Sequence, residues 1–274
     1  MTEQAAAILE ILAGRRTLEP RVMIVVAHPD DETIGMGAQM CRLQDALLVQ
    51  VTDGAPRDGR DAAAHGFASI RDYALARRAE LRDALEAGSA LGVRTEVVGF
   101  PDQEACLNLV TLTEHIIQLL QQEAPAAIFL QPYEGGHPDH DAAAFAVQAA
   151  ARLVAAEGRL PPAVIEMAGY HADGPKLATG AFLPADLPVR TLELDTADRL
   201  RKRRMIDCFA SQRDVLAEFD TAVERFREAP HYDFAQRPHS GELHYEKLGW
   251  SITGEVWRRH AQAALDALGL RSPS

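Results

Sequence analysis

The amino-acid sequence predicts an α/β fold, built as a Rossmann-like, mostly parallel sheet with helices on both faces. Two observations lead to this prediction. Short apolar runs of about 5–7 residues alternate with helical patterns of about 12–20 residues, which is the signature of successive βαβ units. The apolar runs are also continuous instead of alternating with polar residues, as is typical of strands that are buried on both faces.

The first predicted strand covers 21–27 (RVMIVVA), a run rich in β-branched residues that ends at a His-Pro step. Further strands are predicted over 46–51, 94–100, 126–130, 163–170 and 189–194. Helices are predicted over 2–13, 33–44, 70–91, 108–123, 138–156, 196–210, 215–227 and 254–268. A polar loop is predicted over 55–66, and 228–249 is expected to be loop-like.

Individual residues mark several of these boundaries. Pro138 begins the predicted helix 138–156, at a position where a backbone N–H has no helical partner to lose. Gly92 follows the predicted helix 70–91, since glycine readily takes the left-handed conformation that ends a helix. The Thr-Asp-Gly step at 52–54 predicts a turn after the second strand.

The chain has 274 residues, a length that fits one large domain or two small ones. No linker is sharp enough to separate two domains, so we expect a single domain over 1–274. Its catalytic core is expected over about 20–212, followed by a C-terminal extension over about 213–274 that influences the choice of substrate.

Composition narrows the class of function. The chain has 28 Lys and Arg against 40 Asp and Glu, and its net charge of −12 argues against binding to nucleic acid or to anionic membranes. The N-terminal residues resemble neither a signal peptide nor a membrane span, so we expect a cytoplasmic protein. The three cysteines, Cys41, Cys106 and Cys208, fit no disulfide or Cys-x-x-Cys pattern and are expected to be free thiols.

Two clusters of imidazole and carboxylate groups follow predicted strands. The first is His28-Pro-Asp30-Asp31-Glu32 after the first strand, and the second is 137–140 (HPDH) after the fourth strand and its loop. Open α/β sheets place their ligands beyond the carboxyl ends of the strands, so both clusters fall where a site is expected. Imidazole and carboxylate ligands suit a divalent ion such as zinc, which keeps about three protein ligands and one open position in catalytic sites.

The alternative is that these residues only begin helices. Asp30, Asp31 and Glu32 would then complement the positive end of the helix dipole, and Pro138 and Asp139 would be ordinary helix-start residues. This alternative explains one cluster well. It does not explain why two such clusters stand at two strand ends, so we favour a metal site.

At these residues the sequence resembles the PIG-L/LmbE-like zinc N-deacetylases, a family that includes deacetylases of N-acetylglucosaminyl-phosphatidylinositol and of the sugar precursors of mycothiol and bacillithiol. The resemblance is close over about 21–152 and thinner up to about 212. Supporting pieces are Thr-Asp-Gly at 52–54, Arg77-x-x-Glu80, Phe-Pro-Asp at 100–102 and Ser-Gln at 211–212.

The resemblance implies a role for each matching residue. His28, Asp31 and His140 match the zinc ligands, and Asp30 matches the general base. A protonated His137 would stabilise the tetrahedral intermediate, and Asp139 would orient and charge that histidine. Arg77 and Asp102 match positions that contact the substrate. Zinc is the expected metal, and ferrous iron suits the same ligands.

We therefore expect a hydrolase that removes an N-acetyl group from a small N-acetylglucosamine-type conjugate and releases acetate and a free amine. Two alternatives stay open: a zinc amidase that acts on a non-sugar or thiol-conjugate amide, and a metal- or sugar-binding module without turnover. The absence of Gly-x-Gly-x-x-Gly after the first strand disfavours a dinucleotide-binding module. The sequence leaves open whether the chain forms a homo-oligomer.

Four further features have ordinary structural explanations. Arg77 is either a substrate contact or a solvated helix residue that pairs with Glu80 or Glu86, and Tyr133 either stacks on a sugar or packs in the core. The basic run 199–204 (RLRKRR) is interpreted as a solvated helix face. The segment 226–250, rich in His and aromatic residues, is interpreted as a loop that rims the pocket or packs against a neighbouring subunit.

Overall fold

A computed structural model describes residues 1–270 of the chain. Its main element is a seven-stranded sheet with the order β3-β2-β1-β4-β5-β9-β8. The strands are β1 (Val22–Val26), β2 (Ala46–Pro56), β3 (Val93–Asp102), β4 (Ala127–Leu130), β5 (Ala163–Met167), β8 (Arg190–Glu193) and β9 (Val223–Glu228). The first five strands of the chain pair in parallel, and β9 is antiparallel to both β5 and β8. The predicted α/β fold with a mostly parallel sheet is confirmed.

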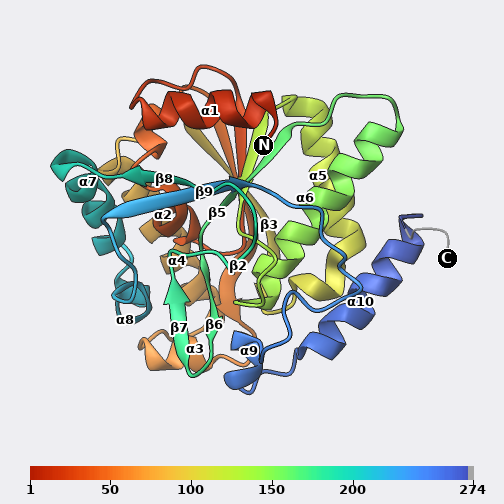
Figure 1. Cartoon of the computed structure of the whole chain (residues 1–274). Coiled ribbons are helices and arrows are strands. Elements are labelled where there is room, and N and C mark those ends of the chain that lie inside the picture. The colour runs from red at the N-terminus through yellow and green to blue at the C-terminus, as the bar shows by residue number, and fades with distance from the viewer. Residues whose placement is uncertain (271–274) are drawn as a thin grey trace.

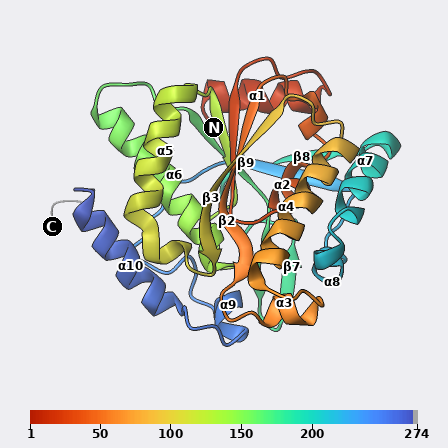
Figure 2. The same ribbon diagram turned by 180° about the vertical axis from the view of Figure 1, so that it is seen from behind.

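Helices cover both faces of this sheet (Figures 1 and 2). One face packs against α5 (Leu109–Glu123), α6 (Pro138–Ala156) and α10 (Gly254–Ala267). The other face packs against α1 (Glu3–Ala13), α2 (Asp31–Met36), α4 (Ile70–Ala87) and α7 (Thr196–Asp207). Strand β1 serves both cores, because its side chains alternate between the face of Met23 and the face of Ile24.

Shorter elements complete the fold. A separate hairpin is formed by β6 (Tyr170–Asp173) and β7 (Lys176–Thr179). The short helices are η1 (Met40–Arg42), α3 (Arg60–Ala64), η2 (Ala105–Asn108), η3 (Ala210–Gln212), α8 (Arg213–Leu216) and α9 (His244–Lys247). Trp257 of α10 is fully buried in the core that also contains Met23, so the C-terminal helix packs in the same core as the central strand.

Several predicted elements have different bounds in the structure. The predicted helix 33–44 is replaced by α2 and η1 with a turn between them, and the turn predicted at 52–54 is part of β2. The predicted strand 163–170 ends at Met167, and Tyr170 begins the hairpin. The helix predicted over 215–227 is wrong, because α8 ends at Leu216 and β9 occupies 223–228. Pairing with β5 and β8 and burial of Phe226 outweigh the helix propensity of this segment.

The basic run 199–204 is not a solvated face throughout. The side chain of Lys202 is 1% exposed, and its ammonium group lies 3.0 Å from Glu224 Oε1 and donates to the carbonyl of Ile34 at 2.7 Å. Glu224 also accepts hydrogen bonds from the amide of Ala38 and from Gln39 Nε2. This buried pair fastens α7 to the antiparallel part of the sheet, which sequence periodicity alone does not reveal.

Two other predictions are confirmed among the residues that the structure describes. Cys41, Cys106 and Cys208 are free thiols. None of the helices within 1–270 combines the length and apolar character needed to cross a membrane.

Candidate metal centre and active site

The two sequence clusters meet at one edge of the sheet. The first cluster follows β1 directly, and the second begins α6 after the loop that leaves β4. Strands β1 and β4 are parallel neighbours, with Val25 opposite Leu130, so their carboxyl ends lie side by side. In the sheet, β2 and β3 lie on one side of β1, whereas β4 and β5 lie on its other side. The clusters therefore lie at the topological switch point of the sheet.

His28, Asp31 and His140 form a buried group that can hold a metal ion. One donor atom from each residue lies within 4.8 Å of the others. Asp31 is central, since its Oδ2 lies 3.4 Å from His28 Nδ1 and its Oδ1 lies 3.2 Å from His140 Nε2. His140 Nε2 is buried and has no hydrogen-bond partner. An orphaned imidazole nitrogen beside a carboxylate and a second imidazole fits a zinc-type ion well.

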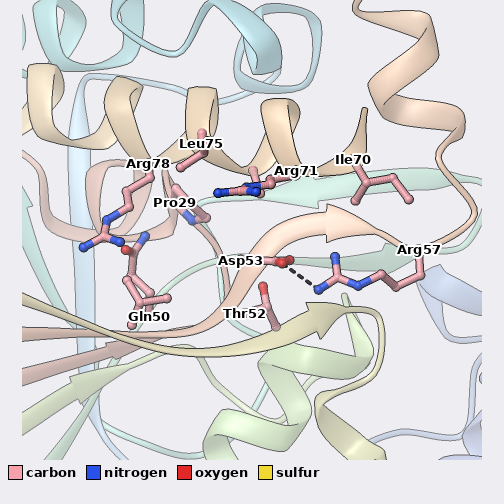
Figure 3. A pocket seen from close by; sticks show the side chains of 11 residues that line it. Pro29, Gln50, Thr52, Asp53, Arg57, Ile70, Arg71, Leu75 and Arg78 are labelled. Atoms are coloured by element: carbon pink, nitrogen blue, oxygen red, sulfur yellow. Dashed lines mark hydrogen bonds and ion pairs between the residues drawn. The ribbon is translucent and has the colours of Figure 1, made fainter. Parts of the chain in front are cut away.

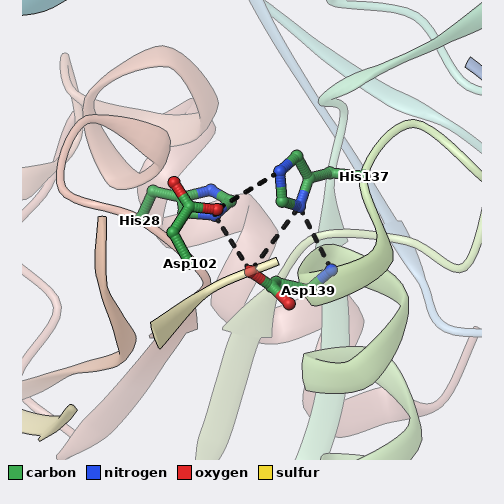
Figure 4. Close-up of side chains that lie close together, drawn as sticks. All are labelled: His28, Asp102, His137 and Asp139. Carbon is green, nitrogen blue, oxygen red and sulfur yellow. Dashed lines mark hydrogen bonds and ion pairs between the residues drawn. The ribbon is translucent and has the colours of Figure 1, made fainter. Parts of the chain in front are cut away.

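His28, Asp102, His137 and Asp139 form a second group beside the first (Figure 4). His28 Nε2 lies 3.1 Å from Asp102 Oδ1 and 3.4 Å from Asp139 Oδ2. The other ring nitrogen of His28 faces Asp31, so this residue belongs to both groups. Carboxylates on the far side of a metal-binding histidine fix the orientation of its ring, and Asp102 and Asp139 stand in that position here.

His137 is held by a backbone group as much as by a carboxylate. Its Nδ1 accepts a hydrogen bond from the backbone amide of Asp139 at 3.1 Å, and its Nε2 lies 3.5 Å from Asp102 Oδ1. The Asp139 carboxylate is 3.8 Å from His137 Nδ1 and accepts from the amides of Gln103 and Ala105 at 2.6 and 3.0 Å. Because Nδ1 is an acceptor, the hydrogen of a neutral His137 lies on Nε2.

An unusual backbone conformation at Asp30 sets the direction of its side chain. Its φ is 123°, a region that residues with a Cβ rarely adopt. The local structure supports this conformation, because the carbonyl of Asp30 accepts from the amides of Thr33 and Ile34 at 2.9 and 3.0 Å and so begins α2. The Asp30 carboxylate lies 3.0 Å from Arg77 Nη2.

Arg77 is buried rather than solvated, and it does not pair with Glu80 or Glu86. It donates from Nη1 to the carbonyl of Gly54 at 2.9 Å and from Nη2 to the carbonyl of Pro29 at 2.8 Å, in addition to Asp30. Glu80 instead accepts from Ser211. Arg77 therefore connects β2, the loop after β1 and the carboxylate of Asp30.

Burial and neighbouring charges shift the pKa values of the two adjacent aspartates in opposite directions. Burial raises the pKa of Asp30 well above its ordinary value, and the Arg77 guanidinium only partly reverses this shift. Burial also acts to raise the pKa of Asp31, but His140 and His28 outweigh it and hold that pKa well below its ordinary value. Asp30 is thus the stronger proton acceptor, while Asp31 stays ionised.

The pKa values of His28 and His137 are also shifted in opposite directions. Burial acts to lower the pKa of His28, but Asp102 and its other carboxylate neighbours raise it well above its ordinary value. Burial lowers the pKa of His137 well below its ordinary value, and the neighbouring His28 lowers it further. This direction favours a neutral His137, whereas the resemblance implies a protonated one.

A cavity of about 350 Å³ opens onto this centre. His28, Asp30, Asp31, Arg77, Asp102 and His137 line it, while Asp139 and His140 lie outside its lining. The structure adds residues that the sequence did not single out for the site, including Tyr170, Gln212 and Phe219. Trp250, from the aromatic segment 226–250, also lines the cavity and packs edge-on against His137, with ring centroids 4.8 Å apart.

Tyr133 is not in this cavity lining. It is 3% exposed and packs between Phe234 and Trp257, with its hydroxyl donating to the carbonyl of Gln236. The core-packing interpretation of Tyr133 therefore applies, and the sugar-stacking one does not.

A second cavity, of about 490 Å³, lies between α4 and strands β2 and β3 (Figure 3). Arg71 and Arg78 line it together with Arg57, whose guanidinium lies 2.7 Å from Asp53. Pro29 lines this cavity, while its neighbours His28 and Asp30 line the cavity at the metal centre, so the loop after β1 stands between the two. His28 and His137 line only the cavity at the metal centre, and the chemistry is therefore expected there.

The fold and the site define an α/β protein with a buried His/Asp metal-binding group at its switch point. Residues 23–151 match the family model described as "PIG-L: GlcNAc-PI de-N-acetylase", and this part of the chain is similar to that family. Over 147 residues it is 32% identical to a probable N-acetyl-α-D-glucosaminyl L-malate deacetylase 2 of Bacillus cereus. That match covers 52% of this chain and 66% of the relative, slightly less than two thirds of its length.

Solved structures with the same fold are more distant in sequence. The A40926 pseudoaglycone deacetylase Dbv21 superposes with a TM-score of 0.59 at 21% identity, over 79% of this chain and 99% of that one. The zinc-inhibited form of the teicoplanin deacetylase Orf2 superposes with a TM-score of 0.56 at 18% identity, over 78% and 99% of the two chains. At these identities the likeness concerns the fold alone.

Proposed function

We propose that the chain is a metal-dependent N-deacetylase that removes the acetyl group from a small N-acetylglucosamine-type conjugate. One observation carries the proposal. Asp30 lines the same cavity as His28 and Asp31, two members of the buried His28, Asp31 and His140 group, within the part of the chain that matches the family model. The substrate class is suggested by the family and by the relative from Bacillus cereus.

His28, Asp31 and His140 would hold the metal, which we propose to be zinc, with ferrous iron as the alternative. When bound, such an ion polarises the amide carbonyl and lowers the pKa of a water molecule in its open position. The donor set supports this assignment, since His140 Nε2 is buried beside the Asp31 carboxylate and makes no hydrogen bond.

The remaining groups of the site would move and hold protons. Asp30 accepts the proton of the attacking water and returns it to the nitrogen of the leaving amine, a role that its raised pKa supports. Arg77 donates to the Asp30 carboxylate and would keep it in place. His137, with its hydrogen on Nε2, donates to the oxyanion of the tetrahedral intermediate, while the Asp139 amide holds its Nδ1.

Acetate release from a panel of N-acetylglucosamine conjugates by the zinc-loaded protein tests the proposal. Free amine should appear with acetate in equal amounts, and a chelator should abolish both. Asp30→Ala should keep its zinc and lose about 10²–10⁴-fold in turnover. Full activity of that variant would refute Asp30 as the base.

Adding non-sugar and thiol-conjugate amides to this panel separates the two alternatives. An amidase with another substrate would release amine only from non-sugar amides, and a binding module would retain metal and ligand without turnover. The cytoplasm is the proposed location, supported by the free thiols Cys41, Cys106 and Cys208.

A further inference from the structure

The cavity over the metal centre has two chemically different halves. Its inner half is formed by the histidines and carboxylates of the centre. Its outer half contains the apolar side chains of Leu177, Val215, Phe219, Leu248 and Trp250, and the polar residues Gln103, Gln212 and His244 also line the cavity. Two of these side chains are exposed, Val215 at 56% and Leu248 at 48%. Large apolar side chains at the mouth of a catalytic cavity leave a surface that a ligand can cover.

Cationic groups for an anionic ligand are lacking on this wall. Among the described residues that line the cavity, Arg77 is the one Lys or Arg. Both of its terminal nitrogens already donate, to the carbonyls of Gly54 and Pro29 and to Asp30, and the residue is 4% exposed. Its Nε has no hydrogen-bond partner but is buried, so the guanidinium offers no exposed donor at the mouth of the cavity.

Two other arginines of α4 face a different cavity. Arg71 and Arg78 line the second cavity, between α4 and the edge of the sheet (Figure 3). At the metal-centre cavity the further charged residues are acidic, since Asp61 and Glu218 line it. A carboxylate or phosphate at this mouth would meet apolar side chains and negative charge, and burying it without a partner would be unfavourable.

From these contacts we propose that the group attached to the sugar is uncharged and apolar, such as an aliphatic or aromatic aglycone. The inference rests on the proposed deacetylase function and adds the class of conjugate. In its choice of aglycone, this chain would then differ from the relative that is named for an L-malate conjugate, because malate carries carboxylates. Here the apolar wall contributes the recognition, and the sugar reaches the inner half of the cavity.

Three substrates test the inference with the zinc-loaded protein: octyl N-acetylglucosaminide, N-acetylglucosaminyl malate and free N-acetylglucosamine. We expect kcat/KM for the octyl glycoside to exceed that for the malate conjugate by at least about tenfold, mainly through a lower KM. Equal or better turnover of the malate conjugate would overturn the inference and leave the deacetylase function intact. No acetate from any of the three would overturn both.

A charge placed at the mouth gives a second test. Leu248→Arg adds a guanidinium at an exposed position of the apolar wall, so we expect the preference for the octyl glycoside over malate to fall at least about fivefold. Leu91→Arg is the matched control, because Leu91 is 92% exposed and precedes β3 at the opposite end of the sheet. A preference that stays unchanged in Leu248→Arg, or that changes equally in both variants, would count against the apolar wall.

Discussion

Replacing Arg77 by methionine should disturb both the stability and the proton chemistry of the site. The variant removes three hydrogen bonds, to the carbonyls of Gly54 and Pro29 and to Asp30, all in buried surroundings. An unpaired buried acceptor costs about 1–3 kcal/mol, and loss of one partner of a buried ion pair costs about 3–5 kcal/mol. These effects overlap, so we expect the free energy of unfolding to fall by about 3–5 kcal/mol at neutral pH.

The pKa of Asp30 gives a second and more specific readout. Burial raises this pKa and Arg77 lowers it, so removing Arg77 should raise it further. The acid limb of the profile of kcat/KM against pH should then move to higher pH in Arg77→Met. Because the folded variant binds the Asp30 proton more tightly than the unfolded chain, its loss of stability should be smaller at pH 5 than at pH 8.

Arg78→Met is the matched control for both measurements. Arg78 is the next residue of α4, is exposed, and lines the second cavity instead of contacting Asp30. Denaturant unfolding and pH–rate profiles of the two variants should therefore differ clearly. An acid limb that stays in place in Arg77→Met would refute the coupling between Arg77 and Asp30.

Three other variants test separate parts of the structure. His140→Ala should bind zinc at least about tenfold more weakly, measured by metal analysis after dialysis; stoichiometric tight zinc would exclude His140 as a ligand. Burial acts to raise the pKa of Asp198, but hydrogen bonds from Arg42 and Arg201 outweigh it and lower the pKa. The wild type should therefore be more stable than Asp198→Asn above about pH 5 and lose this advantage as the pH falls below about 4, in urea unfolding at each pH; an advantage independent of pH would contradict this. Lys202→Met leaves Glu224 buried without its cation and should lower the free energy of unfolding by about 3–5 kcal/mol, and a change below about 1 kcal/mol would show that the pair is dispensable.

The convergence of the two His-Pro-Asp clusters could be predicted because it follows from simple topology. Each cluster directly follows an apolar strand, and parallel neighbouring strands bring their carboxyl ends together. Asp102, at the end of β3, joins the same edge by the same rule. The assignment of individual roles to His28, Asp31 and His140 came from the resemblance and stays a prediction.

The apolar wall could be predicted only in part. The segment 226–250 was expected to rim the pocket, and its residues Leu248 and Trp250 line the cavity. Leu177, in the hairpin, and Val215 and Phe219 carry no sequence signal that places them at the site. Strand β9 was missed because VERFRE is rich in helix-forming residues, and its pairing partner β5 is distant along the chain. Lys202 was placed in solvent because the partner that buries it, Glu224, lies on that missed strand.

The backbone of Asp30 has a consequence for how this chain changes over evolution. A residue with a Cβ at a φ of 123° costs about 1–3 kcal/mol, and glycine would avoid that cost. Glycine at position 30 would also leave the Arg77 guanidinium without its carboxylate partner, so relief of the backbone strain would be offset by loss of a buried ion pair. Stability alone therefore does not select glycine there, and a glycine at this position in a descendant of this chain would remove both the proposed base and the anchor of Arg77.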